Sequence, residues 1–182
     1  MNRCTWCGDD PLYVKYHDEE WGKPVHDDRV HFEFLVLESA QAGLSWITIL
    51  RRREAYKEAF ASFDPIEVAK FTEDDVERLM LNAGIIRNRR KIEAAIGNAK
   101  VFLEIQKEYG SFDVYLWAFV DGEVVKGSFE ATSDLPAKTA LSEKVSKDLK
   151  KRGMKFLGPV IMYAHLQAVG VVNDHLLSCD FR

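Results

Sequence analysis

The chain has 182 residues, of which 47% are hydrophobic, and this length suits one domain or a two-lobed core better than two independent domains. The formal net charge of −4 provides no general attraction to nucleic acid, so any DNA-binding surface must come from local basic clusters. No stretch approaches the roughly 20 apolar residues of a membrane span, and no apolar run follows Met1, so we expect no membrane segment and no signal peptide. Three cysteines disfavour a disulfide framework and favour a reducing, cytoplasmic setting.

Helical signals dominate the chain from one end to the other. Apolar residues recur at helical spacing, capping residues are followed by acids, and glycines close several segments. The segment 120–138 is rich in turn residues and reads as a loop with a small hairpin at 123–125. Because no run of alternating strands appears, we predict an all-α protein. The predicted helices cover 28–42, 45–61, a segment beginning at 65, 72–81, 89–108, 111–117, 139–152 and 159–170.

Cysteines and histidines near both ends of the chain form a candidate metal site. Cys4 and His17 lie near the start, while His175 and Cys179 lie four positions apart, so that one helical turn would bring both to one ion. Thiolate and imidazole ligands suit tetrahedral zinc, and a Cys2His2 set leaves no ligand position for water. We therefore predict a structural zinc that clips the termini together. The Cys4-x-x-Cys7 pair is itself typical of zinc knuckles, so spacing alone leaves the place of Cys7 open.

A glycine-containing turn at 83–87 joins two predicted helices. In a helix-hairpin-helix such a glycine, here Gly84, lets backbone N–H groups approach a phosphate, and the next helix adds its positive pole. Basic residues at 87–91 would complete an anion site that reads no base. A plain corner between two helices explains the same turn. Two other basic clusters, at 51–53 and 150–155, suit solvated helix ends.

Aromatic residues gather in the N-terminal third of the chain, which holds three of the four tryptophans. Flat aromatic faces stack on an extruded base, although core packing also explains each aromatic side chain taken singly. Glu38 lies within an apolar helix, where an inward carboxylate needs a hydrogen-bonding or charged partner. The apolar periodicity around Glu38 permits either an inward or a solvent-facing side chain. The aromatic residues concerned are Trp6, Tyr13, Tyr16, Trp21 and Trp46.

Eight motifs spread over nearly the whole chain carry a family resemblance. They are Cys4-x-Trp6, Asp10-Pro11-Leu12-Tyr13-x-x-Tyr16-His17-Asp18-x-Glu20-Trp21-Gly22, Leu37-Glu38, Gln41-Ala42-Gly43-Leu44-Ser45-Trp46-Ile47-Thr48, Phe63-Asp64-Pro65, Ala83-Gly84-Ile85-Ile86-Arg87, Lys150-Lys151-Arg152-Gly153-x-Lys155-Phe156 and Val172-Asn173-Asp174-His175. In this order and at this spacing they resemble the 3-methyladenine DNA glycosylase I family, a constitutive alkyladenine glycosylase family.

This resemblance implies a divergent helix-hairpin-helix DNA glycosylase fold that occupies 1–182 as a single unit. Two helical lobes, a hairpin at about 79–95 and zinc ligands from both termini are expected. The implied enzyme is a monofunctional hydrolase of base excision repair, which excises 3-methyladenine from alkylated double-stranded DNA without a lyase step. We expect it to act as a monomer in the cytoplasm, with no membrane partner.

The resemblance also assigns roles to individual residues, and Cys7 is not part of its pattern. The resemblance places Glu38 in a base pocket, and we hypothesise that it is the decisive carboxylate there. Gly43 and Leu44 correspond to a wedge that fills the gap left by the flipped nucleotide. The base pocket falls on Glu38, Tyr16 and Trp46, surrounded by Trp6, Tyr13 and Trp21; DNA contacts fall on Gly43, Leu44, Gly84, Arg87, Arg89 and Lys91; zinc ligands fall on Cys4, His17, His175 and Cys179.

The expected chemistry follows from the charge of the substrate. N3-methylation makes adenine cationic, so the base leaves as a neutral molecule and needs little acid catalysis. Glu38 would favour the cationic base over neutral adenine, while Glu104 and Glu108, which follow the hairpin, read as solvated helix surface. Two alternatives remain: a non-catalytic sensor of alkylated DNA, and a glycosylase of wider scope that also removes 7-methylguanine.

Overall fold

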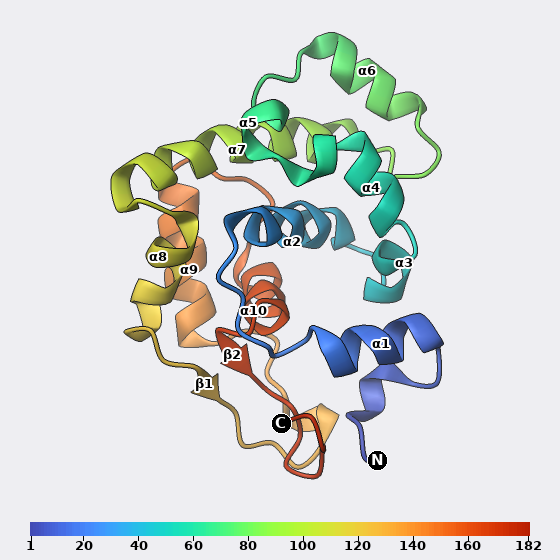
Figure 1. Cartoon of the computed structure of the whole chain (residues 1–182), viewed down its shortest axis with the longest axis vertical. Helices are drawn as coiled ribbons and strands as arrows, with labels where there is room; N and C mark the ends of the chain where they lie inside the picture. Colours follow the sequence, from blue (N-terminus) through green and yellow to red (C-terminus); the bar gives the residue numbers. More distant parts are fainter.

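The computed structural model describes all 182 residues, and helices form nearly all of its regular structure (Figure 1). The prediction of a mainly helical protein is confirmed, and none of the helices has the length and hydrophobicity needed to cross a membrane. The α-helices are α1 (Pro11–Glu19), α2 (Asp28–Gln41), α3 (Trp46–Leu50), α4 (Arg53–Ala59), α5 (Pro65–Val68), α6 (Glu73–Leu81), α7 (Arg89–Tyr109), α8 (Phe112–Trp117), α9 (Ala140–Lys151) and α10 (Pro159–Ala168). Short 3-10 helices cover Thr5–Cys7, Ala61–Phe63, Ala118–Val120 and Thr132–Asp134, and two strands cover Val125–Lys126 (β1) and Val172–Asn173 (β2).

Side-chain caps fix where several helices begin. The Asp64 side chain accepts from the Ile66 N–H at 2.9 Å, with proline in the first turn, as the sequence predicts. Ser111 caps α8 in the same way by accepting from the Val114 N–H at 3.0 Å. Helix α1 is not among the predicted helices, although Asp10 caps it through the same Asp-Pro signal. The start of α1 could therefore have been read from the sequence.

Three predicted elements differ from the structure. The helix predicted over 45–61 is interrupted, because Arg52 has non-helical dihedrals (φ −105°, ψ 0°) that separate α3 from α4. The hairpin predicted at 123–125 is wrong, since β1 pairs in parallel with β2 and Val125 faces Val172. The last long helix ends at Ala168, and the chain turns at Gly170 with a positive φ of 69°.

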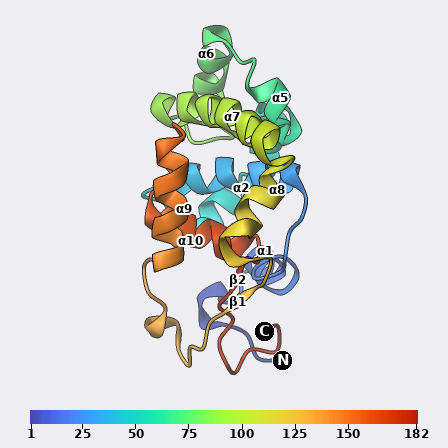
Figure 2. The ribbon, with the colours of Figure 1, turned by 90° about the vertical axis from the view of Figure 1, so that its left-hand side faces the viewer.

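Helix α2 lies at the centre of the molecule, between α7 on one side and α10 on the other (Figures 1 and 2). Nine of its 14 residues are buried, and they face in nearly every direction around the helix axis. A helix enclosed on all sides shows no single apolar face, which explains why periodicity could not orient Glu38. The core forms one continuous cluster of 43 buried residues.

The two chain termini lie together at one end of the molecule, and α6 lies at the opposite end (Figures 1 and 2). The Asp180 N–H donates to the Asn2 carbonyl at 3.0 Å, and the Asn2 N–H donates to the Asp180 carboxylate at 2.8 Å. These reciprocal bonds join segments 178 residues apart in sequence. The Cys and His residues of both termini are thereby brought to one place.

Candidate functional site

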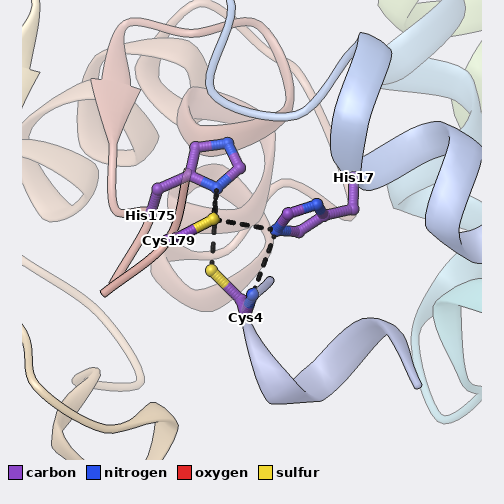
Figure 3. Close-up of side chains that lie close together, drawn as sticks. All are labelled: Cys4, His17, His175 and Cys179. Atoms are coloured by element: carbon purple, nitrogen blue, oxygen red, sulfur yellow. Dashed lines mark hydrogen bonds between the residues drawn. The ribbon is translucent and has the colours of Figure 1, made fainter. Parts of the chain in front are cut away.

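Four buried residues from the two termini converge in a cluster that could hold a metal ion (Figure 3). The ligand atoms of Cys4, His17, His175 and Cys179 all lie within 4.8 Å of one another. Cys179 Sγ lies 3.3 Å from His175 Nδ1 and 3.6 Å from His17 Nε2. Two sulfur and two nitrogen donors in one compact set match the chemistry of tetrahedral zinc.

The second nitrogen of each histidine is held by a neighbouring group. His17 Nδ1 lies 2.7 Å from the Asp18 carboxylate, and His175 Nε2 lies 2.9 Å from the Trp21 carbonyl oxygen. Histidine ligands of metals generally donate this second N–H to a carboxylate or carbonyl, which fixes the tautomer and the ring. Arg3 in turn holds the Asp18 carboxylate and lowers its pKa. These contacts fit a metal-ligand set.

Cys7 lies outside the cluster, so the choice that spacing left open is decided by the fold. Its thiol is directed to the carbonyl oxygens of Cys4 and Gly8, at 3.2 and 3.8 Å. The helical turn predicted to join His175 and Cys179 is absent, because the chain after β2 forms turns. The Cys179 N–H instead donates to the Leu176 carbonyl at 2.8 Å, and this turn brings the two side chains together.

A cavity of about 200 Å³ lies beside the metal-ligand cluster, and we refer to its lining as the aromatic pocket. All six residues predicted for a base pocket line it. Helices α1, α2, α3 and α10 contribute to its walls, together with the segments around Trp6, Trp21 and Thr132. The lining consists of Trp6, Tyr13, Tyr16, Trp21, Glu38, Gln41, Trp46, Thr132, Leu135, Ala164 and Gln167.

Glu38 is buried at the pocket, with 2% of its surface exposed. Its Oε2 atom has no hydrogen-bond partner within the protein, although it is fully covered. Burial raises the pKa of this carboxyl to about 8, because the charged form loses its hydration and gains no compensating charge. The solvent-facing alternative for Glu38 is therefore wrong. An unpartnered buried carboxyl costs stability, which is typical of a group kept for ligand recognition.

Unsatisfied polar atoms concentrate at this pocket. Besides Glu38 Oε2, the buried indole nitrogens Trp6 Nε1 and Trp46 Nε1 have no partner within the chain, and both tryptophans line the cavity. Tyr16, 3% exposed, lies between them, with ring centroids 6.3 Å from Trp6 and 5.6 Å from Trp46. The pocket thus combines flat apolar walls with donors and an acceptor that no protein group uses, as expected for a planar polar ligand.

The metal-ligand cluster and the aromatic pocket share a wall. The Trp6 ring lies edge-on to His17 at a centroid distance of 5.3 Å, and the Trp21 ring lies edge-on to His175 at 4.7 Å. Trp6 and Trp21 also contact each other at 4.9 Å. A cation that fixed the two histidines would therefore also fix two of the tryptophans that form the pocket.

The predicted wedge follows α2 directly. Gly43 has a positive φ of 83°, which lets the chain turn away from the helix, and Leu44 leaves 40% of its surface exposed. Lys91 lies in the first turn of α7, and its ammonium donates to the carbonyls of Ala40 at 2.9 Å and Ala42 at 2.8 Å. This predicted DNA contact therefore also caps the helix end that carries the exposed loop.

The predicted hairpin connects α6 to α7 through residues 82–88. The Gly84 N–H already donates to Asn82 Oδ1 at 2.8 Å, so this donor is not free to bind a phosphate. A Cβ at Gly84 would lie 2.8 Å from the Ala55 Cβ, so close packing against α4 explains the glycine. Arg87 is exposed, whereas the Arg89 guanidinium pairs with the Glu73 and Glu77 carboxylates.

Sequence reasoning missed the pocket residues that come from distant parts of the chain. Gln167 and Ala164 belong to α10, and Thr132 and Leu135 belong to the long segment between α8 and α9. No spacing connects these residues to the N-terminal aromatics. Gln167 lies in the apolar helix that Gly158-Pro159 begins, and a buried amide in such a helix was the available signal.

Comparisons with known proteins show which family the chain resembles. The family model for methyladenine glycosylase matches residues 6–182. The DNA-3-methyladenine glycosylase 1 of Escherichia coli (strain K12) is 48% identical over 179 residues, which are 98% of this chain and 96% of the relative. The DNA-3-methyladenine glycosylase of Haemophilus influenzae is 45% identical over 180 residues, or 99% and 97% of the two chains.

A solved structure of 3-methyladenine DNA glycosylase I from Staphylococcus aureus, which gives the structural basis of its 3-methyladenine recognition, superimposes with a TM-score of 0.95. The two sequences are 43% identical, and the match covers 100% of this chain and 96% of the Staphylococcus aureus chain. The superposition therefore spans the whole of this chain, including both termini. The chain belongs to the methyladenine glycosylase family.

Proposed function

We propose that this protein is a monofunctional DNA glycosylase that releases 3-methyladenine from alkylated double-stranded DNA in base excision repair. The observation that carries the proposal is a buried, unpartnered Glu38 carboxyl in a pocket walled by aromatic rings. The relatives named for this activity match almost the full length of the chain. The reaction adds water to C1′ of the sugar, while the base leaves with the electron pair of the glycosidic bond.

The charge of the methylated base explains what the pocket must do. The methylated base is cationic while it is attached to the sugar, so breaking the glycosidic bond releases a neutral base and needs no proton donor. Recognition then dominates, because the protein must favour a cationic purine over the neutral purines of intact DNA. Extruding a base costs a few kcal/mol, and stacking on aromatic side chains returns on the order of 1–3 kcal/mol per contact.

Glu38 is proposed to provide this charge discrimination. Its pKa of about 8 means that most molecules of the free protein hold it protonated at pH 7. A cation beside the carboxyl favours the ionised form, so a methylated purine would be held by a carboxylate in a water-poor site. Neutral adenine supplies no such charge. Tyr16 and Trp46 are proposed to complete the contact by hydrogen bonding and stacking, with Trp6, Tyr13 and Trp21 around them.

A structural zinc is proposed at Cys4, His17, His175 and Cys179, where it would supply only a fixed crosslink between the termini. The four ligand atoms leave no position for a reacting water, so the ion takes no part in bond cleavage. The contacts of His17 and His175 with Trp6 and Trp21 support an indirect role in keeping the pocket walls in place.

DNA contacts are proposed for two exposed segments near α2 and α7. Gly43 and Leu44 would enter the space left by the extruded nucleotide, and the hairpin at 82–88, with Arg87, Arg89 and Lys91 beyond Gly84, would bind the phosphate backbone in helix-hairpin-helix fashion. Arg89 would have to exchange its acidic partners for phosphate. We propose one folded unit of two helical lobes over 1–182, acting as a monomer. The single continuous core supports the single unit.

Release of free base from methylated duplex DNA tests the proposed function. The wild-type protein should release 3-methyladenine, and Glu38→Gln should reduce the release by at least about 100-fold, because the ionised acceptor is lost (about 2.7 kcal/mol). Glu104→Gln, an exposed acid on α7, is the matched control and should retain wild-type activity. Binding of methylated DNA without release of base would instead identify a non-catalytic sensor, and release of 7-methylguanine would widen the substrate range.

A further inference from the structure

The aromatic pocket contains a second buried polar residue besides Glu38. Gln167 lies in the last turn of α10 and has 9% of its surface exposed. Its backbone carbonyl accepts from the Gly22 N–H at 2.8 Å, which ties this turn to the chain beside Trp21. A flexible amide in a buried wall position can present either an acceptor or a donor to the cavity, so its orientation matters for recognition.

Asp174 determines which end of that amide faces the pocket. Gln167 Nε2 donates to Asp174 Oδ2 at 2.8 Å, and the Tyr163 hydroxyl donates to the same oxygen. Asp174 is 2% exposed and does not itself line the pocket. A Cβ at Gly127 would lie 2.2 Å from Asp174 Oδ1, so the chain immediately after β1 packs closely over the carboxylate and restricts its movement.

The chemistry of these groups permits one amide orientation. Asp174 Oδ2 already receives the Tyr163 hydroxyl and therefore acts as an acceptor, so the nitrogen of the Gln167 amide, which is the donor of that amide, points to Asp174 Oδ2 and the amide oxygen points away. Gln167 Oε1 makes no hydrogen bond with another protein group, whereas Gln167 Nε2 does. Since Gln167 lines the cavity, its free polar atom there is an acceptor.

We propose that Gln167 is a specificity-determining residue that accepts a hydrogen bond from the 6-amino group of the extruded purine, and that Asp174 is the positioning residue that fixes the Gln167 amide for this contact. The inference rests on the proposed function, because it requires a purine in the pocket. The 6-amino group carries two hydrogens, so Glu38 and Gln167 can accept one each. A 6-oxo purine presents an acceptor at the same place, which would face the oxygen of Gln167.

Binding of free bases to the full-length protein tests this assignment by calorimetry. The probes are 3-methyladenine and 3-methylhypoxanthine, which differ in the 6-amino and 6-oxo groups. Wild type should prefer 3-methyladenine by about tenfold or more, because mismatched polar groups in a buried site are strongly disfavoured. Asp174→Asn lets the amide rotate, since asparagine can also donate, and Gln167→Met removes the acceptor. Each variant should reduce the preference by at least about fivefold.

Tyr163→Phe is the matched control, because it removes the other donor to Asp174 and leaves the carboxylate acceptor in place. Its preference should stay within about twofold of wild type. Metal content and thermal unfolding are measured for each variant, since Asp174 precedes His175. If Asp174→Asn fails to fold, the Gln167→Met variant, which keeps Asp174, still tests the role of Gln167 as an acceptor.

The outcomes separate the two levels of the proposal. A Gln167→Met protein that binds 3-methyladenine with wild-type selectivity overturns the role of Gln167. Equal loss of selectivity in Asp174→Asn and Tyr163→Phe overturns the positioning role of Asp174 and indicates general loosening of the pocket. A wild-type protein that neither binds 3-methyladenine nor releases it from DNA overturns the proposed function itself.

Discussion

Replacing Glu38 with glutamine tests the buried carboxyl through the pH dependence of stability. Burial raises the pKa of Glu38 from 4.5 to about 8 in the folded protein. A group whose folded pKa lies above its unfolded pKa contributes its full stability below the unfolded value and loses it as pH rises through the folded value. The wild-type free energy of unfolding should therefore fall between about pH 4.5 and pH 8 because of this one group.

The size of the effect follows from the two pKa values. At about 1.4 kcal/mol for each pH unit between them, the upper bound is roughly 5 kcal/mol, and hydration of the ionised carboxyl through the pocket opening reduces it to about 2–4 kcal/mol. Glutamine does not titrate and keeps a similar shape. The free energy of unfolding of Glu38→Gln minus that of wild type should therefore increase by about 2–4 kcal/mol as the pH is raised from 5 to 8.5.

Urea denaturation of both proteins at pH 5, 6.5 and 8.5 measures this difference. Other groups titrate equally in the two proteins and cancel in the subtraction. Glu104→Gln, whose side chain is exposed on α7, provides the control and should follow wild type at each pH. A stability difference between Glu38→Gln and wild type that does not change with pH would refute the reasoning, because it would mean that the carboxyl is hydrated in the folded state.

Four further predictions concern the metal, the loop, the backbone and the pocket. Cys4→Ser should lower the melting temperature by ~10 °C or more and abolish stoichiometric zinc by elemental analysis; an unchanged melting temperature would argue against the crosslink. Lys91→Met removes the cap from the carbonyls at the end of α2. It should raise KM for methylated duplex DNA about tenfold, while the affinity for the free base, measured by calorimetry, should change little. Gly170→Ala should lower the free energy of unfolding in urea by roughly 2 kcal/mol or more, since φ is 69° and a Cβ would lie 2.1 Å from the Lys23 carbonyl carbon. A smaller loss would show that the chain at Lys23 can move away from Gly170. Trp46→Leu should weaken binding of free 3-methyladenine by on the order of tenfold in the same calorimetric titration, and unchanged affinity would exclude stacking.

The sequence by itself determined the helical class and many of the local boundaries. Caps such as Asp64 and Ser111 act through hydrogen bonds to backbone groups two or three residues away, so neighbouring residues suffice to predict them. The four Cys and His residues also stood out, because their side-chain chemistry is limited to a few uses. The motifs of the family added the pocket residues of the N-terminal third.

The tertiary structure decided how Glu38 and Gln167 are used. Glu38 lies in a helix that is covered on all sides, so only the surrounding helices could show that its carboxyl is buried and unpartnered. Gln167 reaches the pocket from α10, and Asp174 orients its amide from a segment after β2. Both residues lie more than 100 positions from the N-terminal aromatics in the sequence. Their contacts depend on packing across the whole chain, which local propensity and spacing do not specify.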